Sequence, residues 1–211
     1  MPRRQGVVFR RLATVVRLVR NWGATDAEQA ELRSGDEFVP EPADMVTRAV
    51  TIDAPAQEVW SWLVQIGQDR GGMYSYDWAE NLLGLHIHSA DQIRDVWQSL
   101  GPGDEVRLVP RGWLGMKKGY AVPVALVDAG RSIVLRQHPP EHPWDAIWSF
   151  HIIPIGVDRC RLVTRSRAAR QHGLAAVATR AMDPVTLVME RKMLLGIKAR
   201  AERSRKAVST A

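Results

Sequence analysis

Residues 183–203 carry the clearest helical pattern in the chain. Asp183 can cap the first turn of a helix, and Pro184 fits the first helical position, where no N–H donor is required. Because the residue before a proline avoids helical backbone angles, we expect a helix to begin here and no earlier helix to run through unbroken. One face of this helix carries an apolar stripe of Val185, Met189, Met193, Gly196 and Ile197. Leucines elsewhere on its surface indicate that the helix is covered on two sides.

The length of the chain fits one folded domain with an appendage, since a domain of 211 residues can bury about 70% of its unfolded surface. Cys160 is the single cysteine, which excludes an internal disulfide and fits a reducing compartment. No apolar run approaches the roughly 20 residues of a membrane-spanning helix. The sequence therefore predicts a cytoplasmic protein.

The N-terminal region predicts a basic amphipathic helix over residues 8–22, because apolar residues recur there at helical spacing among four arginines. Arginines interrupt the apolar centre that a secretory signal needs, so this arm belongs to the mature protein. We expect it to dock on its own domain, and the alternative is peripheral contact with an anionic membrane. Residues 23–44, rich in acids with Gly35, Pro40 and Pro42, are expected to be a linker. The predicted organisation is an arm and linker over 1–44, a domain over 45–206 and a disordered tail over 207–211.

The predicted domain alternates strands and turns between two helical regions. Residues 45–53 alternate as a half-buried strand, and a helix follows from Pro55 towards Gly67. Ser75 can cap a short helix that ends at Gly84, and Ser89 with Gln92 forms a capping-box pattern for another. Five further strands are predicted, over residues 105–110, 119–128, 132–137, 145–155 and 159–169. The expected order is strand, short helices, five strands and the long helix.

Several segments together resemble the START-like, or SRPBCC, superfamily of polyketide cyclase/dehydrase-like proteins. They are TIDAPAQEVWSWL from Thr51, GDEVRL from Gly103, WSFHIIP from Trp148, RLVTRSR from Arg161 and DPVTLVMERKMLLGIKARAE from Asp183. The resemblance covers residues 45–203, and the segment from Gly72 to Asp91 is similar to a bacterial subgroup of unsettled function. It implies an α+β helix-grip fold, in which a curved antiparallel sheet wraps around the long C-terminal helix and leaves an apolar cavity.

If the sheet grips this helix, strand alternation predicts which side chains line the cavity. Trp148, Phe150 and Thr164 would face the helix, together with Ser166, while Arg161, Arg165 and Arg167 would face away. With Met189 and Met193 from the helix, such a cavity suits a small hydrophobic or amphipathic ligand, such as a lipid, polyketide or isoprenoid. The alternative is a filled core with ordinary buried hydroxyls. Trp113 lies in a glycine-rich segment that is either a loop at the cavity mouth or a plain hairpin tip.

A dense group of polar side chains follows the first helix. The ligand-binding candidates in it are Tyr74, Tyr76, Asp77, Glu80 and His88. Glu80, His88 and Tyr76 are also the catalytic candidates, because a carboxylate, an imidazole and a phenol can exchange protons in a cyclase-, aromatase- or hydro-lyase-like enzyme. A structural role in capping and in hydrogen bonding between elements is the favoured alternative. His86 and His88 have no third ligand at a fixed spacing, so no metal site is expected.

Other kinds of site find no support in the sequence. It contains no glycine-rich phosphate loop and no nucleophile elbow, and no cofactor is expected. Lys and Arg outnumber Asp and Glu by 29 to 23, but the basic C-terminal end has no interleaved aromatic residues for stacking on bases, so no nucleic-acid partner is expected. Three hypotheses remain: a ligand-binding protein, an enzyme that uses the same cavity, and a membrane-surface or protein-interaction module.

Overall fold

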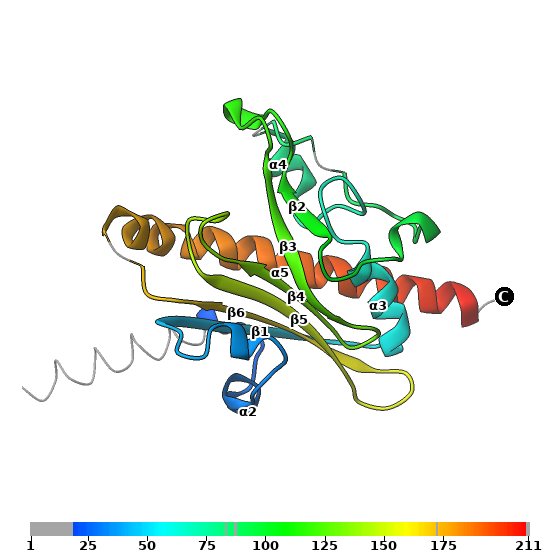
Figure 1. Cartoon of the computed structure of the whole chain (residues 1–211). Helices are drawn as coiled ribbons and strands as arrows, with labels where there is room; N and C mark the ends of the chain where they lie inside the picture. The colour runs from blue at the N-terminus through cyan, green and yellow to red at the C-terminus, as the bar shows by residue number, and fades with distance from the viewer. Residues whose placement is uncertain (1–18, 83, 87, 172, 210–211) are drawn as a thin grey trace, which may run out of the picture.

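A computed structural model describes residues 19–209 apart from positions 83, 87 and 172. Six antiparallel strands form one sheet in the order β1-β6-β5-β4-β3-β2. The sheet curves around the long helix α5, as Figure 1 shows. The strands are β1 (Asp44–Ile52), β2 (Glu105–Val109), β3 (Tyr120–Asp128), β4 (Ser132–Gln137), β5 (Ala146–Pro154) and β6 (Cys160–Ala168). The helices are α2 (Asp26–Ala30), α3 (Ala56–Val64), α4 (Asp77–Leu82) and α5 (Gly173–Ser209), with single 3-10 turns at Asp36–Phe38, Asp95–Trp97 and Trp113–Gly115. The predicted helix-grip architecture and its order of elements are confirmed.

The concave face of the sheet holds the main core. Alternation places Phe150 and Ile152 of β5 and Leu162 of β6 on this face, where they join a cluster with Met193 and Leu194 of α5. Helix α3 adds its own inner face to the same cluster, with Val59, Trp62 and Leu63 buried. The predicted inward direction of the β5 and β6 side chains is therefore confirmed. Most of the length of the concave face is filled by packed side chains.

Helix α5 begins earlier than the sequence predicted. It starts at Gly173 and includes Pro184 in its interior, so the expectation that no earlier helix runs through this proline is wrong. The proline removes one N–H donor from the helix, and the Thr186 hydroxyl donates to the carbonyl oxygens of Met182 at 2.8 Å and Asp183 at 3.1 Å. The helix therefore continues through the proline although Met182, Val185 and Val188 around it are half or more exposed. At its other end, α5 extends to Ser209, past the expected start of a tail at residue 207.

The helix that the capping-box pattern predicts at Ser89 does not form. Ser89 instead holds the start of α4 in place, because its backbone N–H and hydroxyl donate to the two carboxylate oxygens of Asp77 at 2.7 and 2.6 Å. The Ser89 hydroxyl also accepts a hydrogen bond from the backbone N–H of Tyr74 at 3.0 Å. With its hydroxyl committed in this way, Ser89 cannot cap a helix that follows it. The next helical turn is the 3-10 turn Asp95–Trp97.

The segment expected to be a linker packs against the sheet. Residues 19–43, here called the N-terminal segment, cover the outer edge of β1 and the convex face. The backbone N–H of Ala49 donates to the Trp22 carbonyl at 3.1 Å, and that of Thr47 donates to the Asn21 side chain at 2.8 Å. Gly23 permits this approach, because a Cβ atom there would lie 2.1 Å from the Ala49 carbonyl oxygen. Most of the arm predicted over residues 8–22 lies outside the described residues.

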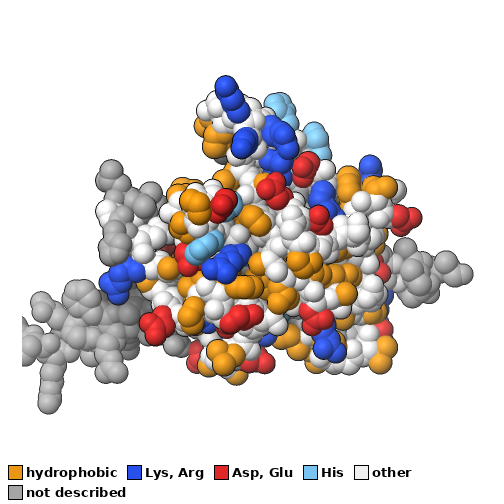
Figure 2. All heavy atoms as spheres, in the orientation of Figure 1, with side chains coloured by type: hydrophobic (Ala, Val, Ile, Leu, Met, Phe, Trp, Pro, Cys, Tyr) orange, Lys and Arg blue, Asp and Glu red, His pale blue; other side chains and the backbone are white. Residues whose placement is uncertain are grey.

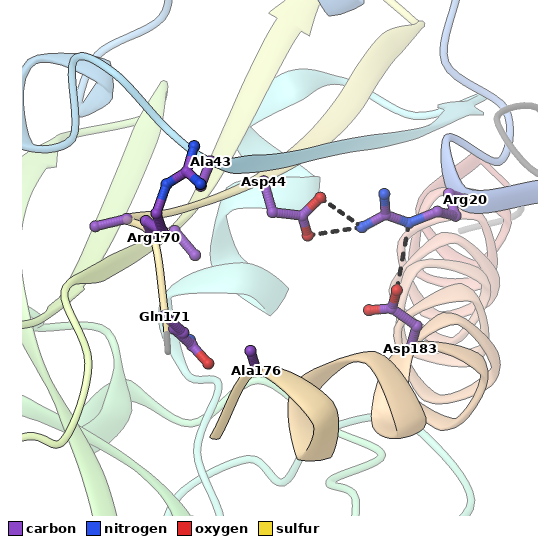
Figure 3. Close-up of a pocket in the computed structure, with 9 residues that line it drawn as sticks. Arg20, Ala43, Asp44, Arg170, Gln171, Ala176 and Asp183 are labelled. Atoms are coloured by element: carbon purple, nitrogen blue, oxygen red, sulfur yellow. Dashed lines mark hydrogen bonds and ion pairs between the residues drawn. The ribbon is translucent and has the colours of Figure 1, made fainter. Parts of the chain in front are cut away.

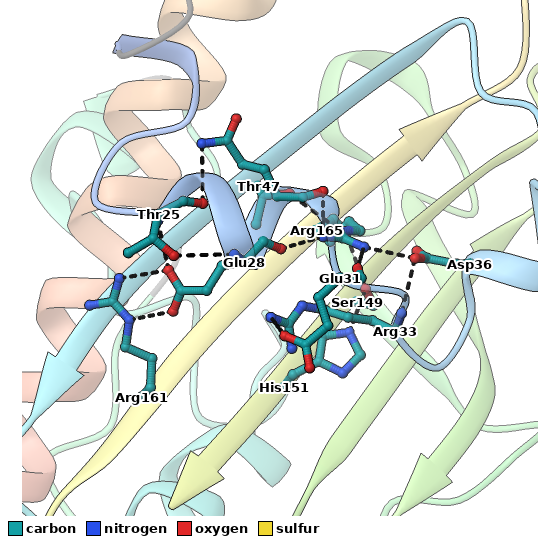
Figure 4. Close-up of polar contacts among 11 residues, drawn as sticks. Thr25, Glu28, Glu31, Arg33, Asp36, Thr47, Ser149, His151, Arg161 and Arg165 are labelled. Carbon is teal, nitrogen blue, oxygen red and sulfur yellow. Dashed lines mark hydrogen bonds and ion pairs between the residues drawn. The ribbon is translucent and has the colours of Figure 1, made fainter. Parts of the chain in front are cut away.

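On the convex face, the N-terminal segment meets the arginines that the alternation of β6 directs away from the helix. Figure 4 shows part of this layer, in which Arg161 binds Glu28 and Arg165 binds Asp36. Arg167 binds the same Asp36 carboxylate. Arg165 also donates to the carbonyls of Glu28 and Glu31, at 2.6 and 2.7 Å. This part of the convex face is therefore buried and polar, and beside it Val39, Val134 and Ile147 form a second, apolar cluster. Within the described residues, no helix is long and apolar enough to cross a membrane.

Candidate functional site

The concave face changes character along its length. At the end near the C-terminus of α5, strands β1 and β6 bring Ile52 opposite Cys160 and Val50 opposite Leu162, and all four side chains are buried. Further along, Arg48 pairs with Thr164, Val46 with Ser166 and Asp44 with Ala168. Along this face the side chains are first apolar and then charged. Near the first turns of α5, Ser166 and Ala168 are small and partly exposed. The candidate site lies in this second half.

A buried ion pair marks the change. Arg48 of β1 binds Glu190 of α5, and their side chains are 6% and 8% exposed. Glu190 also accepts hydrogen bonds from the Thr164 hydroxyl and, at 3.3 Å, from the indole N–H of Trp148. Removing both charges from water is costly, and these additional hydrogen bonds offset part of that cost. One carboxylate on the helix is thereby tied to three strands.

Arg20 extends this polar group towards the surface. Its carbonyl accepts a hydrogen bond from Arg48 Nε at 3.0 Å, and its own guanidinium donates to both carboxylate oxygens of Asp44, at 2.8 and 2.6 Å. Arg20 Nε lies 3.5 Å from Asp183 Oδ2 on α5. Burial lowers the pKa of Arg20, but its hydrogen bond to Asp44 and the charges of Asp44 and Asp183 outweigh burial and raise the pKa above its usual value. Arg20 therefore links β1 to α5 as a permanent cation (Figure 3).

A pocket of about 390 Å³ opens beside Arg20, between the ends of β1 and β6 and the first turns of α5. Figure 3 shows Gln171, Ala176 and four charged side chains around it, which are Arg20, Asp44, Arg170 and Asp183. Its wall combines alanine methyl groups with charged and amide groups. The lining residues are Arg20, Ala43, Asp44, Ala168, Ala169, Arg170, Gln171, Ala176 and Asp183. Such a wall can hold a small apolar body and hydrogen-bond to a polar substituent on it.

The side chains predicted to line a cavity lie deeper than this pocket. Trp148 and Thr164 contact Glu190, whereas Phe150 and Met193 belong to the packed core and Met189 is half-buried on α5. None of these five lines the pocket. The sequence analysis did not predict the charged residues of the pocket as site residues. A signal for the ion pair was present, because the pattern of β1 places Arg48 on the same face as Val46 and Val50.

Tyr74 and Asp77 have structural contacts. The Tyr74 hydroxyl donates to the Trp62 carbonyl at 3.0 Å and accepts from the Gln65 amide at 3.0 Å. Burial raises the pKa of Tyr74 to about 12, against smaller opposing effects of Gln65 and nearby arginines. Gly196 of α5 allows the Tyr74 backbone to pass close by, since a Cβ atom there would lie 2.1 Å from the Tyr74 carbonyl oxygen. Tyr74 therefore holds the segment before α4 against α3, and Asp77 joins the start of α4 to Ser89.

The remaining candidates of the polar group lie away from the pocket beside Arg20. Tyr76 is half-buried under Lys192, whose Nζ lies 5.5 Å from the ring centroid, and Glu80 lies in α4. His86 and His88 are exposed and border a second pocket of about 420 Å³, together with Gln68, Asp69, Arg70, Ser89, Ala90, Arg94 and Trp97. Among the described residues, no three His, Cys, Asp or Glu side chains are grouped as metal ligands would be. Trp113 lies at the tip of the β2–β3 hairpin.

The sheet order and the grip on α5 agree with the resemblance noted in the sequence. The chain has a helix-grip fold. No protein-family model and no curated protein matches the sequence. Among solved structures, the Zhui aromatase/cyclase from Streptomyces sp. R1128 is similar over 76% of this chain and 94% of its own, with 19% identity and a TM-score of 0.47.

Two further solved structures are similar over most of the chain. Norcoclaurine synthase from Thalictrum flavum, in complex with dopamine and hydroxybenzaldehyde, matches over 80% of this chain and 92% of its own, with 14% identity and a TM-score of 0.42. A protein from Thermobifida fusca matches over 75% and 93%, with 15% identity and a TM-score of 0.48. At these values the likeness carries no argument about a ligand or an activity of this chain.

Proposed function

We propose that the protein binds a small amphipathic molecule in the pocket between the ends of β1 and β6 and the first turns of α5. The observation that carries this proposal is the pocket of about 390 Å³ at the open end of the concave face. The packed core and the buried Arg48–Glu190 pair close the concave face further in, so a ligand would occupy this end only.

The size of the pocket favours a small compound. Small-molecule pockets span about 300–1,000 Å³, and this pocket is at the lower end of that range. A compound with one or two fused rings, or a short isoprenoid chain, fits such a volume better than a lipid with two acyl chains. The alanine methyl groups of β6 and α5 would contact the apolar body of the compound.

The charges around the pocket favour a ligand with a hydroxyl or amino substituent. Asp44 and Asp183 share one cation, Arg20, and a carboxylate has about four lone-pair positions for hydrogen bonds. Each carboxylate can therefore accept a hydrogen bond from a ligand O–H or N–H while it remains bound to Arg20.

Native mass spectrometry with a panel of hydroxylated aromatics, short-chain isoprenoid alcohols and two-chain lipids tests the proposal. We expect retention of a member of the first two classes, and loss of retention in Ala168→Phe, whose ring would fill the pocket from β6. Ala199→Phe places the same ring on an exposed position of α5 and serves as the control. Thermal unfolding of both variants shows whether they remain folded.

A ligand retained equally well by wild type and Ala168→Phe would contradict binding in this pocket. So would a panel from which the wild type retains nothing. In Asp183→Asn, which keeps the shape of the side chain and removes its charge, we expect weaker binding of amino compounds than of the matching hydroxyl compounds. Equal weakening of both would overturn the assigned role of that carboxylate.

A further inference from the structure

Helix α4 and the tip of the β2–β3 hairpin project together from the body of the protein (Figure 1). We call residues 77–82, 84 and 110–119 the projecting tip. Its two parts lie against one another, since a Cβ atom on Gly84 would lie 4.0 Å from the indole nitrogen of Trp113. The hairpin part contains a 3-10 turn over Trp113–Gly115. The projecting tip is separate from the pocket beside Arg20, because it shares no residue with the lining of that pocket.

Large apolar side chains on the projecting tip face solvent. Trp78 and Leu82 of α4 are 72% and 81% exposed, and Leu114 and Met116 of the hairpin are 81% and 38% exposed. Single exposed apolar residues are ordinary on protein surfaces, but four on two neighbouring elements form a patch. Such a patch at the end of a projection indicates contact with an apolar partner.

Leu114 has an unfavourable backbone conformation for which the fold shows no compensating contact. Its φ is 44° and its ψ is 35°, in the left-handed region. That region disfavours a bulky side chain, whereas glycine and asparagine accept it readily. The Leu114 side chain is exposed, so its packing against the described residues offsets little of this conformational cost. A leucine at this position is best explained by a binding partner in which the apolar side chain becomes buried.

The hairpin part of the projecting tip is basic. Arg111, Lys117 and Lys118 are exposed and form no ion pair with any residue that the structure describes, and residues 110–119 include no Asp or Glu. Figure 2 shows hydrophobic and Lys or Arg side chains side by side on this projection, at the top of the view. The acidic residues of α4 are Asp77, which is bound to Ser89, and Glu80. Cationic side chains around exposed apolar ones complement an anionic surface with an apolar interior.

We infer that the projecting tip inserts into the surface of an anionic lipid membrane. Trp78 and the leucines would enter the boundary between headgroups and acyl chains, and the basic side chains would contact anionic headgroups. A stable protein partner usually covers about 800 Å² of each surface, which favours a broad face over a narrow projection. A bilayer, in contrast, surrounds a projection on all sides.

Co-sedimentation of the full chain with phosphatidylcholine vesicles, with and without phosphatidylglycerol, tests this inference. We expect binding that requires phosphatidylglycerol and weakens with salt. Leu82→Ser combined with Leu114→Asn should weaken binding about tenfold or more, because burial of these side chains drives insertion. Asparagine suits the left-handed conformation at position 114, so this change should not lower the melting temperature. Lys117→Gln and Lys118→Gln should each weaken binding roughly fivefold.

Two matched controls separate the projecting tip from the rest of the surface. Val157→Ser removes an exposed apolar side chain between β5 and β6, and Arg131→Gln removes an exposed charge between β3 and β4. Both should bind vesicles like the wild type. Wild-type binding that is absent, or that is equal for neutral and anionic vesicles, would overturn the inference. Binding that survives in the tip variants and is lost on removal of residues 1–18 would assign the membrane contact to that arm instead.

Discussion

Arg165 Nη1 of β6 lies 2.7 Å from Asp36 Oδ2 of the N-terminal segment, and both side chains are buried on the convex face of the sheet. Asp36 also binds Arg167 at 3.1 Å and accepts a hydrogen bond from the backbone N–H of Arg33 at 3.0 Å. One carboxylate is therefore the counter-charge for two buried arginines. The N-terminal segment belongs to the same folded unit as the sheet, and its contribution to stability can be measured.

Replacing Asp36 with Asn should destabilise the fold strongly. The change keeps the size of the side chain but leaves Arg165 and Arg167 buried without their carboxylate, and breaking a buried pair in this way costs about 3–5 kcal/mol. The free energy of unfolding from urea titration measures the effect. Asp128→Asn, at an exposed position at the end of β3, is the control and should change stability by less than about 0.5 kcal/mol. A small loss for Asp36→Asn would show that water reaches these arginines.

His151 should make stability depend on pH. Burial lowers the pKa of His151 to about 4, and the positive charges of Arg33 and Arg165 act in the same direction against the smaller opposite effect of Asp36. Below pH 6.5 the unfolded chain gains a proton that the folded protein does not bind, so stability should fall between pH 6.5 and 4, by up to about 1.4 kcal/mol per pH unit. Urea titrations from pH 7.5 to 5.5 test this loss of stability. Most carboxylates titrate below this range, so they contribute little to the change.

The variant His151→Gln supplies the control for that pH dependence. Glutamine can still hydrogen-bond to Ser149, which lies 3.0 Å from His151 Nε2, but it does not titrate. The slope of stability against pH should therefore become flatter in the variant between pH 6.5 and 5.5. An unchanged slope would assign the effect to another group.

The Arg48–Glu190 pair predicts a double-mutant result. Glu190→Gln should cost about 3–5 kcal/mol, because Arg48 then remains buried without a counter-charge. Arg48→Met combined with Glu190→Leu removes both charges and should be more stable than Glu190→Gln alone. Chemical denaturation of Arg48→Met, Glu190→Leu and the double variant gives the coupling energy. A double variant that loses as much as the sum of the single ones would show that the two side chains act independently.

Gly196 should not tolerate a side chain. In Gly196→Ala the new Cβ atom would lie 2.1 Å from the carbonyl oxygen of Tyr74, so the loop before α4 must move away from α5. Overpacking of this kind costs about 1–3 kcal/mol. Gly101→Ala is a suitable control, since a Cβ atom there meets nothing within 4 Å. Melting temperatures of the two variants compare them, and equal values would mean that the loop yields freely.

Strand positions could be predicted closely from the sequence, because alternation and turn residues are local signals. The segment expected over residues 132–137 matches β4, and Trp148 and Thr164 face α5 as expected. The continuation of α5 through Pro184 could not be predicted, since Asp183 and Pro184 together form the local pattern of a helix start and proline lacks the N–H donor of a helix interior. Local pattern is informative only where the neighbouring elements do not override it.

The pocket and the N-terminal segment depend on contacts between residues far apart in the sequence. Arg20 meets Asp44 and Asp183, and no spacing rule relates these positions. The segment before β1 resembled a linker because it contains Gly35, Pro40 and Pro42 among many acids, yet two of these acids pair with arginines of β6. The alternation of Arg161, Arg165 and Arg167 on one face did indicate a polar surface, but the sequence did not show that the chain covers that surface with its own residues.

The hydrogen bonds from Ala49 and Thr47 to Trp22 and Asn21 shield the outermost strand of the sheet. A shortened protein that starts at residue 45, where the sequence places the domain, would leave the free edge of β1 open to pairing with strands of other molecules. Expression of such a fragment should give aggregates, and a fragment that starts near residue 19 should not. The practical boundary of the folding unit therefore lies before Arg20.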